Sequence, residues 1–403
     1  MKFAHIADCH IGSWRRDKVL KEISKKYFIK AIDVMLNEKV DFVLIAGDLF
    51  DSAVPNIDSI KVVVEQLKRL KDSNTLVYFI AGSHDFSPSG KTMLDVLEKA
   101  DLGINVFKYD NIDEKLKLNI FMENKTNTAI VGLPGKKGAL EKKLYANLYK
   151  DHFKNINSFK IFMFHSALDE LKPSEMKEVE TMPLTMLPEG FDYYAGGHVH
   201  VVKESNIKGY NIVFPGPVFP NNFNELETLK KGGFYIVEDN KKRFISLEDH
   251  LIYSFKLDCS GKTPSEVEDD VKNLVSLKSF EDGIITLRFQ GTLLSGRPSD
   301  INFNDLVPLF HDAGALVVLK NTRKLSSKIL NSLKIECHDV SSIENEIIKE
   351  HEPQNIFDES ITKSLINALS AEKIDGEKSL DYEKRVFTDV EILLETETNT
   401  LEQ

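Results

Sequence analysis

The feature that most constrains the fold is an alternation of short apolar runs with longer amphipathic stretches, from Phe3 to about Ile245. Runs of four to seven apolar residues are typical of buried strands, and the stretches between them have helical spacing. The predicted strands are Phe3 to Ala7, Phe42 to Ala46, Val77 to Ala81, Ala129 to Gly132, Ile161 to Phe164 and Tyr193 to Ala195. The predicted helices carry apolar faces made by Ile23, Tyr27, Ile32, Met35 and Leu36, and by Ile60, Val63, Val64, Leu67 and Leu70. The pattern predicts an α/β architecture with its chemistry at the strand ends.

The pattern changes after residue 249. Two strand-like runs, Ile284 to Gln290 and Leu316 to Lys320, flank turn residues at Ser295 to Asp300, with helical stretches at Pro264 to Leu277 and Leu306 to Phe310. We therefore predict three parts: a first domain at 1–249, a small α+β domain at 250–325 and a helical segment at 326–403. The last 16 residues contain no Lys or Arg, so the segment is expected to end in a frayed acidic tail.

Composition excludes some classes of protein. The apolar runs are far shorter than the roughly 20 residues that a membrane helix needs, and the start of the chain does not resemble a secretory signal. A cytoplasmic protein without a membrane segment is expected. Cys9, Cys259 and Cys337 are widely separated and form no CxxC pair, which favours neither a disulfide framework nor a zinc knuckle. The net charge of −11 indicates no general nucleic-acid binder, although a local basic groove remains open.

Metal-ligand residue types stand at the ends of five predicted strands. They are Asp8-Cys9-His10, Gly47-Asp48, Gly82-Ser83-His84-Asp85, His165 and Gly196-Gly197-His198-Val199-His200. If each segment continues the strand period of two, Asp8 and His10 share one side of the chain while Cys9 points elsewhere, and His198 and His200 do the same. The glycines allow sharp turns and a close approach of the backbone.

Carboxylates and imidazoles without a thiolate favour manganese, zinc or iron. Two such ions about 3.5 to 4 Å apart clamp the attacking and leaving oxygens of a phosphoryl group. Each motif alone occurs often by chance, and a single His on an apolar strand is usually a core residue. Their joint occurrence in chain order predicts a dinuclear site. His5 is expected to pack inside its strand, and His152, His250, His311, His338 and His351 are expected to be surface or structural residues.

The same motifs resemble the calcineurin-like metallophosphoesterase superfamily. The strings IADCHIG, IAGDLFDSAVP, AGSHDFSPSG and FPGPVFPNNFNELE are similar to those of its DNA-repair branch, which comprises bacterial SbcD and the archaeal and eukaryotic meiotic-recombination-eleven nucleases. LRFQGTLLSGRPSDINF and VVLKNTRKL resemble the DNA-facing cap of the archaeal type. The resemblance implies a metallophosphoesterase β-sandwich flanked by helices, with the cap at 250–325 and a helical ATPase-docking segment at 326–403.

The resemblance also implies roles for individual residues. Asp8, His10 and His200 would hold one metal, His165 and His198 the other, and Asp48 would bridge both, with Mn²⁺ as the expected ion. His84 would lie beside the scissile phosphate and protonate the leaving oxygen. The implied activity is metal-dependent exonuclease and single-strand endonuclease cleavage of DNA ends during double-strand-break repair.

Two positions depart from the family pattern. Ser83 stands where relatives usually have Asn, so this shorter ligand is expected to reach the second metal only through water. Asp51, four residues after Gly47, stands where relatives often have His, which would remove a donor near the phosphate if the side chain points inward. Reduced or metal-dependent activity is expected.

Basic residues near the motifs are candidate DNA contacts, because Lys and Arg neutralise phosphates. They are Trp14 with Arg15 and Arg16, Lys136 with Lys137, and Arg297, Lys320, Arg323 and Lys324 in the cap. Taken singly, each of them is more often an ordinary solvated charge than a DNA contact.

Relatives act as homodimers that bind an SbcC-type (Rad-fifty family) coiled-coil ATPase, and one amphipathic segment is a candidate for that contact. Its apolar face consists of Ile356, Phe357, Ile361, Leu365, Ile366 and Leu369. Packing of this helix on its own domain is an equal alternative. The predicted helix from Ile60 to Leu70, with Leu94 and Leu97, could pair across a dimer or be buried within the chain.

Two other functions remain open. A phosphomonoesterase or cyclic-nucleotide phosphodiesterase would use the same metals on a small substrate, but members of that kind seldom carry a cap and helical tail. An end-binding scaffold with a metal site weakened at Ser83 is the second alternative. The presence of every other ligand and of His84 argues against the scaffold.

Overall fold

The computed structural model describes residues 1–87, 90–136, 138, 140–172, 180–276, 278–328, 359–374 and 379–401. The chain forms two compact units. The first comprises Met1–Asp258, Ser265–Gln290 and Ile301–Lys324, and the second comprises Cys259–Pro264, Gly291–Asp300 and Leu325–Gln403. The predicted division at residues 249 and 325 stays a prediction.

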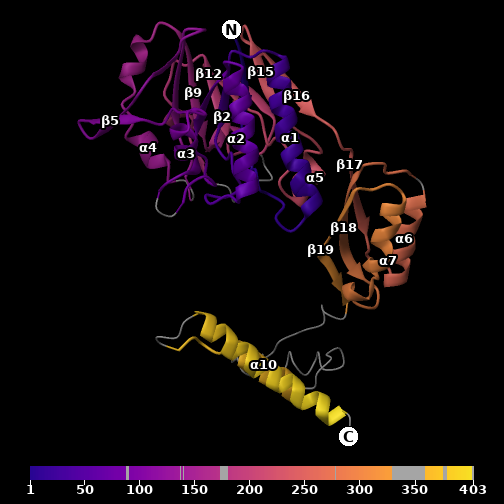
Figure 1. Ribbon diagram of the computed structural model, residues 1–403. Coiled ribbons are helices and arrows are strands. Elements are labelled where there is room, and N and C mark those ends of the chain that lie inside the picture. The colour runs from indigo at the N-terminus through magenta and orange to yellow at the C-terminus, as the bar shows by residue number, and fades with distance from the viewer. Residues whose placement is uncertain are drawn as a thin grey trace. The chain divides into compact units, whose positions relative to one another are not determined.

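Two six-stranded sheets form the large part of the first unit (Figure 1). The first sheet has the order β16 (Lys241–Leu247), β15 (Gly232–Glu238), β1 (Lys2–Ile6), β2 (Phe42–Ala46), β3 (Leu76–Ile80) and β4 (Ile104–Asn105). The second has the order β13 (Lys203–Ile207), β14 (Tyr210–Phe214), β12 (Tyr193–Gly197), β9 (Phe159–His165), β8 (Thr128–Leu133) and β7 (Phe121–Glu123). All six predicted strands are present, with ends shifted by no more than two residues.

The sheets pack face to face over an apolar core. Phe3 stacks on Phe42 with ring centroids 5.0 Å apart, and Tyr193 of the second sheet meets Phe3 edge-on at 5.2 Å. Burying aromatic side chains of this size is a large part of what stabilises such a sandwich. β1, β2 and β3 run parallel, as do β8, β9 and β12, so the carboxyl ends of three strands meet at one edge of each sheet.

Helices cover the outer faces. α1 (Lys18–Asn37) and α2 (Ile57–Asp72) lie side by side against the first sheet (Figure 1), joined by α3 (Met93–Lys99) in the same apolar cluster. Asp17 accepts hydrogen bonds from the first turn of α1, and Thr92 forms a capping box with Asp95 at α3, which explains where both helices begin. This arrangement confirms the predicted fold class, an α/β sandwich of two sheets flanked by helices. α4 (Lys142–Ala146) and the hairpin of β5 (Tyr109–Ile112) and β6 (Lys115–Leu118) contribute Tyr145 and Leu118 to the apolar cluster of the second sheet. β10 (Ala167–Leu168) pairs with β11 (Thr181–Met182).

A smaller three-stranded sheet follows, with the order β17 (Ile252–Asp258), β18 (Ile284–Leu293) and β19 (Val317–Ser327). α6 (Pro264–Ser276) and α7 (Phe303–Asp312) match the two predicted helical stretches. β17 was not among the predicted strands, because its side chains are mostly half-buried and give no continuous apolar run. α5 (Phe223–Thr228) is a short helix between β14 and β15.

The C-terminal part contains α9 (Glu359–Leu369) and α10 (Ser379–Leu401), which contact each other. α10 continues to Leu401, and the expectation of a frayed acidic end stays a prediction. In the described part of the chain, helices are all too short or too polar to span a membrane.

Candidate metal centre

The candidate ligands lie just beyond the strand ends, where the backbone leaves the extended conformation. Asp8, His10, Asp48 and His198 all have positive φ, at 50°, 43°, 50° and 88°. Non-glycine residues rarely adopt this region. Backbone strain of this kind is found mainly at functional sites, where the surrounding contacts maintain it. The expectation that a strand period of two aligns Asp8 with His10 is therefore wrong. The two side chains converge because both residues turn left-handed after β1, while Cys9 is buried in the helix-side core.

Two glycines leave room for the ligands. A Cβ on Gly82 would lie 2.2 Å from Oδ1 of Asp48, and one on Gly47 would lie 2.2 Å from Nδ1 of His165. Gly47 also has φ of +90°. No other residue type fits these positions without displacing a candidate ligand. The glycine backbone does approach closely, as predicted. The groups that it approaches are the side chains of Asp48 and His165.

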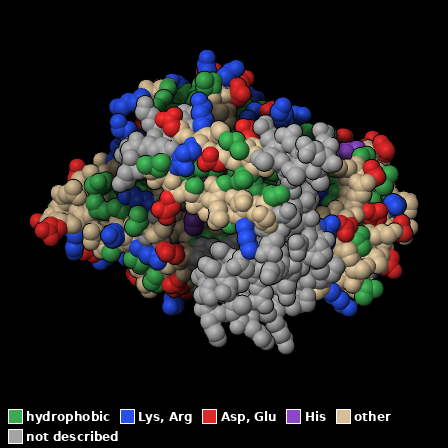
Figure 2. Space-filling model, turned by 90° about the horizontal axis from the view of Figure 1, so that it is seen from below, with side chains coloured by type: hydrophobic (Ala, Val, Ile, Leu, Met, Phe, Trp, Pro, Cys, Tyr) green, Lys and Arg blue, Asp and Glu red, His purple; other side chains and the backbone are tan. Residues whose placement is uncertain are grey.

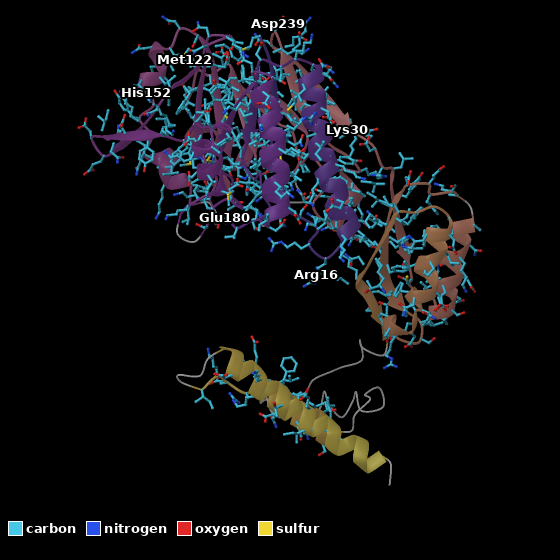
Figure 3. All side chains as sticks on the ribbon, viewed as in Figure 1. Arg16, Lys30, Met122, His152, Glu180 and Asp239 are labelled. Atoms are coloured by element: carbon cyan, nitrogen blue, oxygen red, sulfur yellow. The ribbon has the colours of Figure 1, made fainter. Side chains whose placement is uncertain are left out.

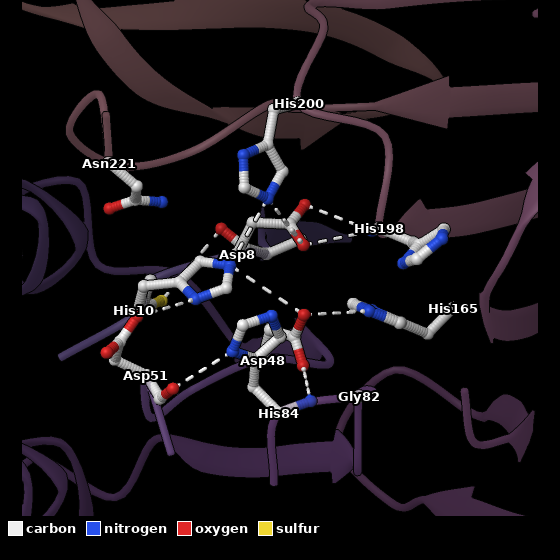
Figure 4. A network of polar contacts seen from close by, with 12 residues as sticks. Asp8, His10, Asp48, Asp51, Gly82, His84, His165, His198, His200 and Asn221 are labelled. Atoms are coloured by element: carbon white, nitrogen blue, oxygen red, sulfur yellow. Dashed lines mark hydrogen bonds and ion pairs between the residues drawn. The ribbon is translucent and has the colours of Figure 1, made fainter. Parts of the chain in front are cut away.

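The first cluster consists of Asp8, His10 and His200 (Figure 4). Nε2 of His10 lies 3.2 Å from Nε2 of His200, and Nε2 of His200 lies 3.7 Å from Oδ1 of Asp8. His200 donates from Nδ1 to Oε1 of Glu225 at 2.8 Å, which leaves its Nε2 lone pair directed at the cluster. The backbone N–H of His198 donates to Asp8 and fixes that carboxylate.

The second cluster consists of Asp48, His165 and His198. His165 donates from Nδ1 to the carbonyl oxygen of Ala46 at 2.8 Å, and its Nε2 lies 3.1 Å from Oδ2 of Asp48. The same Asp48 oxygen lies 3.7 Å from Nε2 of His10. One carboxylate therefore reaches both clusters.

Burial and charge in these clusters shift the pKa of three imidazoles, those of His165, His198 and His200. Burial opposes protonation of His165, but Asp48 raises its pKa to about 10. Burial likewise opposes protonation of His200, but Glu225 and Asp8 raise its pKa to about 9. Burial and the neighbouring His165 lower the pKa of His198 to about 3. In the absence of a cation, positive charge is thus supplied by protons on two of the histidines, and a metal ion would replace them.

The donor set fits divalent metal ions. The hydrogen bonds made by Nδ1 of His165 and His200 fix the tautomers in which Nε2 is the ligand atom. In that tautomer a nitrogen lone pair faces a carboxylate oxygen in each cluster, which is stable only when a proton or a cation lies between them. Imidazole and carboxylate without a thiolate is a set suited to manganese, iron or zinc.

His84 lies at the edge of both clusters. Its backbone N–H donates to Oδ1 of Asp48 at 2.7 Å, and its Nδ1 donates to the carbonyl oxygen of Asp51 at 2.9 Å (Figure 4). Its ring meets that of His10 edge-on, 4.7 Å between centroids. Ser83 is buried beside it, and its role as a ligand stays a prediction.

The side chain of Asp51 faces two basic groups at the rim of the site. Its carboxylate lies 3.6 Å from Nδ1 of His10 and 3.3 Å from Arg15. Its main-chain carbonyl orients His84. Asp51 thus supports the histidines from the side.

Three acidic residues support the site without having been assigned a role from the sequence. Glu225 orients His200, as described above. Asp85 accepts hydrogen bonds from the N–H groups of Gly82 and Phe50, tying two loops together, and burial and the nearby Asp48 raise its pKa to about 7. Glu141 accepts from the Ser166 hydroxyl at 2.8 Å and from the Lys136 N–H at 3.1 Å. Glu225 lay in the FNELE part of a quoted motif, and that was its only sequence signal.

The other histidines of the described chain have structural partners. His5 is fully buried and hydrogen-bonds to the Tyr193 hydroxyl at 3.0 Å, as expected for a packed residue. His152, labelled in Figure 3, bonds to the carbonyl oxygens of Tyr149 and Leu118. His250 and His311 each face a carbonyl oxygen. His338 and His351 lie outside the described residues.

The candidate DNA contacts occupy separate places. Arg16 is exposed on the loop before α1 (Figure 3), and Arg15 lies beside Asp51. Trp14 donates from Nε1 to the carbonyl oxygen of Pro220 and packs against the core, and its contact with DNA stays a prediction. Lys136 is half-buried, and Lys137 lies outside the described residues.

The remaining basic candidates are in the smaller sheet and its loops. Lys320 and Arg323 line a hollow of about 480 Å³ together with Asn222, Phe223 and Asn224, and Lys324 is exposed next to Arg323. Arg297 pairs with Asp300 at 3.5 Å. In the face drawn in Figure 2, basic and acidic side chains alternate among the described residues, with no continuous basic patch in view.

The candidate protein contacts are also only partly described. Ile361, Leu365, Ile366 and Leu369 lie in α9, with Leu369 61% exposed, whereas Ile356 and Phe357 lie outside the described residues. The apolar face of α2, including Val63 and Leu67, is buried in the chain's own core with Leu94 and Leu97. For that face the structure shows the buried alternative.

Comparison with known proteins agrees with this geometry. Residues 1–202 match the family model of the calcineurin-like phosphoesterases. The DNA double-strand break repair protein Mre11 of Methanococcus maripaludis is 27% identical over 91% of this chain and 95% of its own length. That of Sulfolobus acidocaldarius is 25% identical over 97% of this chain and 100% of its own length, and that of Methanopyrus kandleri is 28% identical over 62% of this chain and 56% of its own.

Proposed function

Because this chain belongs to the calcineurin-like phosphoesterase family, we propose that it is a metal-dependent DNA nuclease that processes DNA ends in double-strand-break repair. One observation carries the proposal furthest: a single oxygen of Asp48 lies 3.1 Å from His165 and 3.7 Å from His10. A carboxylate shared by two ligand clusters is what a two-metal phosphodiesterase site requires. The printed name of the relatives, a DNA double-strand break repair protein, supports DNA as the substrate.

In this proposal Asp8, His10 and His200 hold one divalent ion, and His165 and His198 hold the other. Asp48 bridges the two. Mn²⁺ is the proposed ion, because the ligand set mixes carboxylate with imidazole. When bound, the two ions supply Lewis acidity to the phosphoryl group and charge stabilisation to the attacking and leaving oxygens.

His84 is the proposed catalytic side chain. The hydrogen bond from its Nδ1 to Asp51 leaves Nε2 as the atom that orients the phosphate and that, in the imidazolium form with a proton on each nitrogen, gives a proton to the leaving oxygen. Its backbone N–H, which donates to Asp48, ties the position of this proton donor to the shared carboxylate. Ser83 is proposed to reach the second ion through water, because its side chain is shorter than that of Asn.

A comparison of three substrates tests the function. The chain is incubated in Mn²⁺ with linear duplex DNA, with bis-p-nitrophenyl phosphate and with a small phosphomonoester. Cleavage of the DNA and the diester, lost in Asp48→Asn, is the expected result. Hydrolysis of the monoester alone would identify a small-molecule phosphatase, and hydrolysis of none of them with retained binding of DNA ends would identify a scaffold.

We also propose that the chain acts as a homodimer with an SbcC-type (Rad-fifty family) coiled-coil ATPase. Ile366 and Leu369 are exposed apolar side chains of α9, and together with the half-buried Ile361 and Leu365 on the same helix they support a docking role for this segment. Co-purification of the full chain with that ATPase, compared with a chain ending at Ser327, the last residue of β19, tests the docking. Equal recovery of the ATPase with both chains would remove this part of the proposal.

A further inference from the structure

The metal-ligand candidate His200 depends on a helix that is too short to be stable by itself. Glu225 accepts from Nδ1 of His200 at 2.8 Å, and it lies in α5, which has only six residues. Isolated helices shorter than about 12 residues are marginal in water. The position of the Glu225 carboxylate is therefore set by whatever holds α5 in place.

Two contacts within the large part of the first unit hold the helix. Leu226 is fully buried in the core, and Asn222 caps the helix by accepting from the N–H of Glu225 at 3.0 Å. The Glu225 carboxylate also accepts from the Asn221 N–H at 2.8 Å. These contacts fix one side of α5.

The other side is held by Arg288 of β18. Its guanidinium donates from Nε to both carboxylate oxygens of Glu227, at 3.0 and 2.9 Å, and from a terminal nitrogen to Glu227 at 2.6 Å. It also donates to Oδ1 of Asn224 at 2.6 Å and lies 5.0 Å from the ring centroid of Phe223. One side chain thus contacts three of the six residues of the helix.

This ion pair differs from the surface pairs elsewhere in the protein. The side chains of Arg288 and Glu227 are only 13% and 6% exposed, so water screens their attraction weakly. A fork-shaped guanidinium also fixes geometry, which a lysine ammonium cannot do. Arg243 and Glu38 form an ion pair of similar length, 2.7 Å, but are 54% and 28% exposed and lie on other elements.

We propose that Arg288 is a positioning residue of the metal centre, acting through α5 and Glu225 on the His200 imidazole. The path runs from Arg288 to Glu227 and Asn224, along one turn of helix to Glu225, and from Glu225 to Nδ1 of His200. The inference rests on the proposed metal site. In this inference the smaller sheet, through Arg288, sets the metal affinity of the site that contains His200.

Metal binding tests the path without any use of DNA cleavage. Mn²⁺ is titrated into the metal-free full chain by calorimetry for the wild type, Arg288→Gln, Arg288→Lys and Glu225→Gln, with Arg243→Gln as the matched control. Removing a residue that orients a metal-bound histidine costs roughly 10- to 100-fold in affinity, which is the expectation for Glu225→Gln. Because Arg288 acts through Glu225, Arg288→Gln is expected to weaken one of the two sites about threefold to tenfold. Arg288→Lys is expected to recover little of this loss, and Arg243→Gln is expected to match the wild type.

A double-mutant cycle separates this role from a general effect on folding. In the Glu225→Gln background, Arg288→Gln should add less than about a twofold change, because the path is already interrupted. An unchanged dissociation constant in Arg288→Gln, or an equal loss in both backgrounds, would overturn the inference. Circular dichroism in EDTA checks the fold of each variant. If Arg288→Gln fails to fold, Asn224→Ala is used instead with the same expectation, because it removes one hydrogen bond of the same path. If the wild type itself binds no Mn²⁺, the proposed metal site fails together with the inference.

Discussion

His5 makes the stability of this protein sensitive to acid in a way that can be measured apart from its activity. The imidazole is fully buried between the two sheets, and burial lowers its pKa to about 3. An unfolded histidine has a pKa of about 6.5. Between these values the unfolded chain binds a proton at this position and the folded chain does not, so the folded state loses stability as the pH falls below about 6.5.

The size of the effect follows from the two pKa values. Each pH unit below about 6.5 costs about 1.4 kcal/mol until the folded imidazole itself titrates near pH 3. At pH 4.5 the loss attributable to His5 is therefore about 2.7 kcal/mol. His5→Phe removes the titrating imidazole but keeps an aromatic ring against Tyr193. Between pH 7 and pH 4.5 the free energy of unfolding of this variant should therefore fall by less than that of the wild type, and the difference should equal the loss attributed to His5.

Urea unfolding in EDTA, followed by circular dichroism at both pH values, measures this difference. The offset at pH 7, which includes the unpaired Tyr193 hydroxyl of the variant, cancels because only the change with pH is compared. Tyr193→Phe is the matched control, since it removes the same hydrogen bond but keeps the imidazole, and it should retain the acid sensitivity. An equal loss of stability in the wild type and His5→Phe would refute the reasoning.

Four further predictions concern the metal centre and its surroundings. Gly82→Ala should destabilise the fold by about 1 to 3 kcal/mol and weaken Mn²⁺ binding, because the new Cβ would lie 2.2 Å from Oδ1 of Asp48. Urea unfolding measures the stability and calorimetry measures the binding. Wild-type values in both experiments would contradict the steric argument. Ser83→Asn should tighten binding of the weaker Mn²⁺ ion, as the longer side chain can ligate directly, and calorimetry that finds no change would remove Ser83 as the cause of weak binding. His84→Ala should lower the rate of DNA cleavage at least about 100-fold while the dissociation constants for Mn²⁺ stay within about threefold, and cleavage at the wild-type rate would end its catalytic assignment. Arg16→Gln should reduce the slope of log binding constant against log salt concentration by about 0.9, as measured by fluorescence anisotropy with duplex DNA, whereas an unchanged slope would place Arg16 off the DNA.

Most strands predicted from the sequence are buried on both faces, but such burial is not sufficient, because the largely buried internal strands β14 and β15 were not predicted individually. β2 is a continuous apolar run because helices cover one side of its sheet and the second sheet covers the other. β13 and β17 were not predicted individually, because they lie at sheet edges where much of their surface is half-buried or exposed. Edge strands carry a weak hydrophobic signal for this physical reason.

The ligand residues could be proposed from the sequence because parallel strands bring their carboxyl ends together. The geometry of these residues could not be predicted from the sequence. The left-handed conformation of Asp8 and His10 depends on hydrogen bonds to Gly47 and Asp48, which are distant in sequence. Glu225 was missed for the same reason, since its contact with His200 is made only by the folded chain and no spacing rule predicts it.

The state of bound Mn²⁺ tests the central claim, a shared Asp48 between two ions, most directly. Electron paramagnetic resonance of the chain loaded with two equivalents of Mn²⁺ reports whether the ions are magnetically coupled. The account predicts two ions per chain with an exchange-coupled spectrum that Asp48→Asn converts to that of isolated ions. One ion per chain, or two ions with uncoupled six-line spectra in the wild type, would contradict it.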